Sequence, residues 1–120
     1  MLKIFILFLW MWFKMFKKVS KGTIIKKVRN SGSYFFSKDA IRFFDCIVDD
    51  FGYIDYISGD IYIITSERFD YNTPRLYTVR RFKLDCDNFY DHECINRFQE
   101  FKNYDDAYER LIFMVGDDEE

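Results

Sequence analysis

Apolar residues recur at helical spacing in two segments of the chain, one on each side of a central stretch. Spacings of three and four residues predict an amphipathic helix over residues 38–51, after the N-cap Ser37 and ending at Gly52. The same pattern predicts a second helix over residues 104–115, after the N-cap Asn103. Two helices should therefore flank whatever the central residues form.

The central stretch is rich in β-branched and aromatic residues separated by turn signals. Residues 53–57 and 61–67, joined by Ser-Gly-Asp, predict a hairpin. Residues 75–84 and 94–101 predict two further strands, and a polar loop over 85–93 joins them.

This order of elements predicts an α+β fold. We expect a small two-layer domain over residues 34–116, in which three or four strands lie between two helices (α-β-β-β-α, or one strand more) and the helices pack on one face of an antiparallel meander sheet. Residues 1–33 should form an apolar and basic N-terminal appendage and linker, with an edge strand at 23–28, and residues 117–120 an acidic tail. The predicted core comprises Phe43, Phe44, Ile47, Val48, Ile61, Ile63, Val79, Phe98, Leu111 and Ile112.

The N-terminal end has an unusual composition. Residues 4–13 are all apolar, and residues 1–30 contain eight Lys or Arg and no acid, whereas the rest of the chain is acidic. Ten helical residues span about 15 Å, which is short against a hydrocarbon core of about 30 Å. Three hypotheses stay open: a membrane tether through residues 2–16, nucleic-acid binding through a basic arm at 14–29, and an upstream extension of a protein that starts at Met11 or Met15 rather than Met1. The acidic body disfavours nucleic acid.

The cysteines indicate the compartment. Cys46, Cys86 and Cys94 are odd in number and lack the spacing of a disulfide framework. A cytoplasmic location is therefore expected, at the inner face of the membrane if residues 2–16 form an anchor.

Signatures of catalysis or metal binding are weak. Cys86, His92 and Cys94 have thiolate and imidazole chemistry, but their spacing matches no paired zinc knuckle, so we assign no metal and no cofactor. His92 is the single histidine, no serine lies in G-x-S-x-G, and no nucleotide-binding glycine motif occurs. We therefore expect a protein without enzymatic activity.

One polar set on consecutive predicted strands is the best candidate for a binding site. It comprises Ser66, Glu67, Arg75, Tyr77 and Arg80. Glu67 could form an ion pair with Arg80 or Arg81 across the sheet, and such pairs are more often structural than functional.

Three segments carry a resemblance to a known family. They are SYFFSKDAIRFF, YIITSERFDYNTPRLYTVRRF and FQEFKNYDDAYERL. Over about residues 34–111 the chain resembles a family of short uncharacterised phage and mobile-element proteins, with a TSE…R-x-YTVR pattern. The resemblance implies that Thr65, Ser66, Glu67, Arg75, Tyr77, Thr78 and Arg80 form the most recognisable part, and it carries over no activity. We therefore expect an accessory protein that acts by binding a protein partner.

Overall fold

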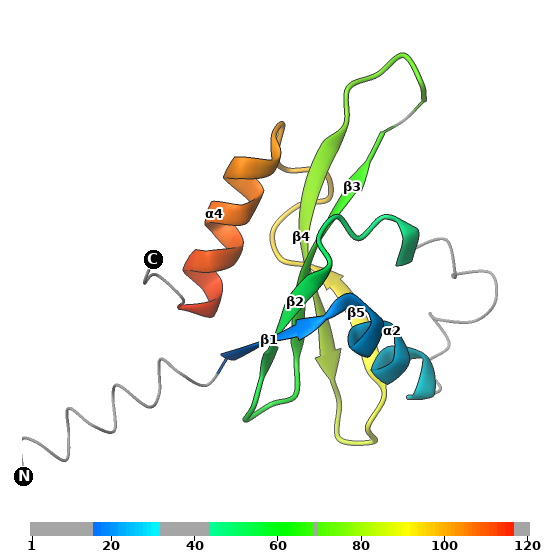
Figure 1. The fold of residues 1–120 in the computed structure, drawn as a ribbon, viewed down its shortest axis with the longest axis vertical. Coiled ribbons are helices and arrows are strands. Elements are labelled where there is room, and N and C mark those ends of the chain that lie inside the picture. Colours follow the sequence, from blue (N-terminus) through cyan, green and yellow to red (C-terminus); the bar gives the residue numbers. More distant parts are fainter. Residues whose placement is uncertain (1–15, 32–43, 69, 117–120) are drawn as a thin grey trace, which may run out of the picture.

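The structure is a computed structural model, and it describes residues 16–31, 44–68 and 70–116. Its elements in chain order, drawn in Figure 1, are β1 (Phe16–Ser20), α2 (Lys21–Asn30), β2 (Phe51–Asp55), β3 (Ile61–Glu67), β4 (Leu76–Leu84), β5 (Tyr90–Cys94) and α4 (Tyr104–Val115).

The five strands form one sheet in the order in which they occur in the chain, β1-β2-β3-β4-β5, and every neighbouring pair is antiparallel. The predicted α+β class and the antiparallel meander are therefore confirmed. The hairpin of β2 and β3 and the long strand β4 also lie where the sequence predicts them.

Within the described residues, the helices α2 and α4 cover opposite faces of this sheet (Figure 1). Ile61 and Ile63 of β3 pack with the buried residues of α2, whereas Tyr62 and Ile64, on the other side of the strand, pack with those of α4. The two helices predicted at residues 38–51 and 104–115 were expected on one face, whereas the helix opposite α4 is α2, which the sequence analysis assigned to the linker. The difference follows from β3, which is buried on both faces and therefore needs cover on both.

Of the predicted linker at residues 17–33, the described part forms most of β1 and the helix α2 instead. Ser20 caps α2, because its Oγ accepts a hydrogen bond from the Thr23 backbone N at 3.1 Å. Ile24 and Val28, one helical turn apart, are fully buried against the sheet. The prediction of an edge strand at 23–28 was wrong because this spacing places the apolar residues on one side of a helix.

The predicted end of the first helix at Gly52 is also wrong, since Gly52 lies within β2. Residues 32–43 lie outside the described residues, and only Phe44 and Asp45 of the described part of this helix are helical. A Cβ at Gly52 would lie 2.7 Å from Ile24 Cδ1 and 2.8 Å from the Tyr62 carbonyl oxygen. Glycine thus allows α2 to approach β2 closely.

Residues 46–48 pair with the edge of β3 rather than forming a helical turn. The backbone N of Val48 donates to the Ile64 carbonyl at 3.0 Å, and that of Ser66 donates to the Cys46 carbonyl at 2.8 Å. β2 pairs with β3 only as far as Tyr62, so the rest of the β3 edge would otherwise carry unsatisfied backbone groups. This requirement overrides the helical pattern of the sequence.

The last strand is shifted from its prediction. Asp85 Oδ1 accepts the backbone N–H groups of Asp87 and Phe89 at 2.9 and 3.0 Å, and Asn88 has φ 67°, so the turn is tight. Pairing with β4 therefore resumes at Tyr90 and ends at Cys94. Of the predicted strand at 94–101, the end remains as an isolated bridge between Phe101 and Tyr77.

The C-terminal helix lies as predicted. Asn103 Oδ1 accepts the Asp106 backbone N at 2.9 Å, and Gly116 ends the helix with φ 70°. Of the predicted core, six residues are buried: Phe44, Ile47, Ile61, Ile63, Val79 and Leu111. Val48 and Phe98 are exposed, Ile112 is half-buried, and Phe43 lies outside the described residues.

Within the described ranges, no helix has the length and apolar character needed to cross a membrane. The apolar run at residues 4–13 lies outside those ranges.

Candidate functional site

The five predicted site residues gather where β3 and β4 pair beyond the end of β2. In the register of the two strands Ser66 lies opposite Tyr77, and Arg80 lies opposite Ile63. Because side chains alternate along a strand, Glu67 and Arg80 project from one face of the sheet while Ser66 and Tyr77 project from the other. Arg75 directly precedes β4.

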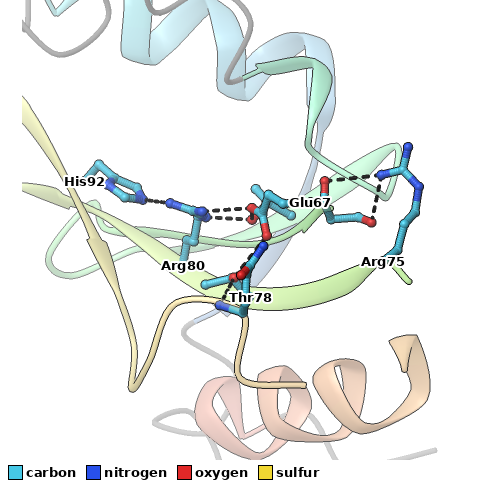
Figure 2. A network of polar contacts seen from close by, with 8 residues as sticks. Glu67, Arg75, Thr78, Arg80 and His92 are labelled. Carbon is cyan, nitrogen blue, oxygen red and sulfur yellow. Dashed lines mark hydrogen bonds and ion pairs between the residues drawn. The ribbon is translucent and has the colours of Figure 1, made fainter. Parts of the chain in front are cut away.

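Glu67 and Arg80 form the centre of a buried network, shown in Figure 2. Arg80 Nη2 lies 2.8 Å from Glu67 Oε2, and Arg80 Nε donates to Thr65 Oγ1 at 2.6 Å. The Thr65 and Thr78 hydroxyls donate to the two Glu67 oxygens at 2.5 and 3.2 Å. We call Thr65, Glu67, Thr78, Arg80 and His92 the buried network. The ion pair that the sequence suggested for Glu67 is therefore made with Arg80.

His92 extends the network onto β5. Its Nε2 accepts a hydrogen bond from Arg80 Nη1 (Figure 2). Burial, and then the positive charge of Arg80, lower the pKa of His92 to about 4. The imidazole is therefore neutral at physiological pH and acts here as an acceptor.

The segment after β5 is fastened to the same network. The backbone N of Gln99 donates to Thr78 Oγ1 at 2.7 Å, and Gln99 adopts a left-handed φ of 58°. The ring of Phe98 lies 5.3 Å from the Arg80 guanidinium. Thr78 thus joins the sheet to the segment that leads into α4.

Arg75, Ser66 and Tyr77 line a pocket that is open to solvent. Arg75 Nη1 donates to Ser66 Oγ at 3.1 Å. Figure 2 marks the contacts of Arg75 with dashed lines. The pocket has a volume of about 270 Å³. We call it the hairpin pocket, and its lining residues are Asp45, Cys46, Ile47, Val48, Ser66, Arg75 and Tyr77.

The wall of the hairpin pocket formed by residues 45–48 is held from two sides. It pairs with the edge of β3, and the Tyr104 hydroxyl of α4 donates to Asp49 Oδ1 at 2.7 Å. This wall is therefore hydrogen-bonded to the sheet, and the residue that follows it is hydrogen-bonded to α4.

The thiol in this wall is a weak nucleophile. Burial, and then the negative charge of Glu67, raise the pKa of Cys46 above its usual value. The thiol is therefore protonated at neutral pH.

The residues once considered as zinc ligands do not converge. Cys86 is exposed in the turn before β5, whereas the His92 ring is directed at Arg80. In the part of the chain that the structure describes, no group of three or more Cys, His, Asp or Glu side chains could hold a metal ion.

Sequence reasoning did not select all members of the network. Thr65 and Thr78 were named only through the family resemblance, and His92 only as a zinc candidate. The alternation of side chains along a strand could have identified the two threonines. Thr65 lies two residues from Glu67 and Thr78 two residues from Arg80, so each shares a face of the sheet with its neighbour in the network. For Gln99, which lies in an irregular segment, no such signal exists.

These features define a small antiparallel α+β domain with an internally bonded polar network and an open pocket beside it. The model of DUF7447, a family of unknown function, matches residues 22–112, and the chain belongs to this family. No curated protein and no solved structure matches the chain. The match includes most of α2, so it begins before residue 34, where the resemblance was expected to begin.

Proposed function

We propose that this chain is a small non-enzymatic accessory protein that binds a protein partner at the hairpin pocket. The phage or mobile-element origin is part of this proposal and rests on the sequence resemblance. The observation that carries the proposal is the exposed guanidinium of Arg75, fastened to Ser66 beside Tyr77 at an open pocket.

The pocket lining suggests the chemistry of the partner. Arginine and tyrosine are enriched among the residues that dominate binding energy at interfaces. Arg75 uses Nη1 for Ser66, and its other donors, which have no partner among the described residues, suit a carboxylate in a bidentate arrangement. Ile47 and Val48 supply apolar surface in the same pocket. A segment with a carboxylate beside an apolar side chain would fit.

The proposal assigns Glu67 and Arg80 a supporting role. Both lie in the buried network, where their polar atoms bond to one another and to Thr65. A neutral imidazole at His92 and a protonated thiol at Cys46 favour binding over acid–base or nucleophilic catalysis. The predicted set thus divides into a contact group, Ser66, Arg75 and Tyr77, and a supporting pair.

Charge reversal at Arg75 tests the proposal. The immobilised protein would be incubated with an extract of the cells in which its gene is expressed, and retained proteins would be quantified by mass spectrometry. The amount of partner retained by Arg75→Glu should be at least about tenfold lower than with wild type, since charge-assisted contacts contribute about 1.5–3 kcal/mol to binding. Arg68→Glu, an exposed arginine of the same loop that contacts the Tyr71 ring, is the matched control and should retain the partner.

Circular dichroism of both variants would establish that the fold is unchanged. A partner retained equally by wild type, Arg68→Glu and Arg75→Glu would show that the hairpin pocket is not the binding surface.

A further inference from the structure

The polar groups that line the hairpin pocket can donate further hydrogen bonds. Nη1 of Arg75 is directed at Ser66, whose hydroxyl and carbonyl oxygens lie 3.1 and 3.5 Å away. Nε and Nη2 have no partner among the described residues, and together they form one edge of the guanidinium, which a carboxylate can bind with both oxygens. The hydroxyl groups of Ser66 and Tyr77 have no acceptor within the described part of the chain. The pocket therefore offers several donors to an anion.

The charges of the pocket favour an anion with a single negative charge. Asp45 and Arg75 are the two charged residues of the lining, so the lining is neutral overall. A carboxylate adds one negative charge, whereas a phosphate group adds about 1.5 to 2 and is repelled more strongly by Asp45. The pocket is thus better matched to a carboxylate than to a phosphorylated side chain.

The apolar wall and the size of the pocket restrict the ligand further. Ile47 and Val48 supply apolar surface, and Val48 is 40% exposed. The carboxylate of Asp45 can accept a hydrogen bond from an amide N–H. The pocket volume of about 270 Å³ is below the roughly 300–1,000 Å³ of sites for drug-sized ligands. A space of this size suits the end of a chain rather than a folded surface.

We propose that the hairpin pocket binds the C-terminal residue of the protein partner, and that this residue is apolar. Only the last residue of a chain carries a carboxylate, an apolar side chain and an amide N–H on one Cα atom. Nε and Nη2 of Arg75 bind the carboxylate, the side chain packs on Val48, and Asp45 accepts the amide N–H. An internal Asp or Glu would bring a carboxylate but no apolar side chain of its own. The assignment rests on the function proposed above, since it names the part of the partner that enters the pocket.

Two peptide libraries test the proposal without knowledge of the partner. Both contain the same random hexapeptides, with free C-terminal carboxylates in one library and amidated ends in the other. The immobilised full chain would be incubated with each library, and the retained peptides would be identified by mass spectrometry. Free-carboxylate peptides should be retained at least about tenfold more, because the amide lacks the charge that Arg75 binds. Leucine, isoleucine, valine and phenylalanine should be enriched at the last position of the retained peptides.

Three variants test whether the pocket is responsible. Arg75→Gln should lower retention of the free-carboxylate peptides at least about tenfold. Arg68→Gln, which removes an exposed arginine of the same loop, is the matched control and should retain them like wild type. Val48→Ser keeps the backbone hydrogen bond to Ile64, and it should weaken the preference for an apolar last residue while retention still requires the carboxylate. Circular dichroism would show that the three variants are folded.

Two results would overturn the proposal. One is equal retention of the two libraries, or equal retention of the free-carboxylate peptides by wild type and Arg75→Gln. The other is preferential retention of a third library, with one internal phosphoserine and amidated ends, which would identify a phosphate site. In either case the proposed function survives if Arg75→Glu still loses a protein from the cell extract, because an internal segment of the partner would then occupy the pocket. If Arg75→Glu retains that protein, the proposed function fails as well.

Discussion

Replacing Glu67 by glutamine should destabilise the domain by about 3 kcal/mol. The side chains of Arg80 and Glu67 are only 7% and 14% exposed, so the substitution leaves the Arg80 charge buried without its counter-ion. Removing one partner of a buried ion pair costs about 3–5 kcal/mol. Glutamine keeps the shape of Glu67 and can still accept a hydrogen bond, which favours the lower end of that range. The total free energy of unfolding of a small domain is about 5–15 kcal/mol, so this loss would be a large part of it.

Urea unfolding followed by far-ultraviolet circular dichroism measures this loss. With a slope of about 1.5 kcal/mol per molar urea, the midpoint of Glu67→Gln should fall by about 2 M. The matched control is Glu93→Gln, which removes the partner of Arg81 in a pair whose side chains are 28% and 40% exposed. Exposed pairs contribute about 0–1 kcal/mol, so the control midpoint should move by well under 1 M.

Equal and small shifts in the two variants would refute the reasoning, because burial would then make no difference to the pair. A double variant, Glu67→Leu with Arg80→Leu, adds a second criterion. It leaves no buried charge and should lose less stability than the sum of its two single variants. A loss equal to that sum would show that the Glu67–Arg80 interaction is not the origin of the effect.

Two glycines and one histidine give further predictions. In urea unfolding, Gly52→Ala should lower the free energy of unfolding by about 1–3 kcal/mol, since its Cβ would meet Ile24. Gly22→Ala, whose Cβ would have nothing within 4 Å, should raise it by about 0.4–1 kcal/mol. A lower stability in both variants would contradict the packing argument. The pKa of His92 in the folded protein, about 4, lies below its ordinary 6.5, so the unfolded chain takes up the proton first and stability should fall as the pH drops from about 6.5 to about 4. In His92→Asn this fall in stability should be missing. If the urea midpoint of His92→Asn falls as much as that of wild type between pH 6.5 and 5, His92 is not the source of the pH dependence.

The sequence was a good guide where local chemistry determines structure. α4 has its cap, its apolar side and its terminal glycine within 14 residues, so its limits follow from adjacent residues alone. The β2–β3 hairpin is similar, since Gly59 in the turn adopts φ 83°, which glycine favours.

The sequence was a poor guide where pairing with a distant strand determines the local structure. Residues 46–48 have helical spacing, yet they form backbone hydrogen bonds with Ile64 and Ser66, about 18 residues further along the chain. The position of α2 depended on Ser20 as a cap and on the pair Ile24 and Val28, a weaker signal than the β-branched run that predicted a strand.

The candidate site was predicted in part for the same reason. Residue types and strand positions pointed to Ser66, Glu67, Arg75, Tyr77 and Arg80 as neighbours. Alternation along the paired strands places these five residues on two faces of the sheet. To predict which residues share a face, one must know the pairing register as well as the limits of the strands. The pocket wall at residues 45–48 could not be predicted, because it depends on pairing with β3.

The placement of α2 before the strands β2 to β5, and of α4 after them, affects how the protein can fold as it is synthesised. α2 emerges from the ribosome before β3 and β4, the strands that it covers, and α4 emerges after them. A nascent chain that ends before Tyr104 can therefore bury one face of its sheet, while Tyr53, Tyr62, Ile64 and Val79 on the other face stay open to water and to other chains. Completion of the fold, and protection from aggregation, thus wait for the last helix.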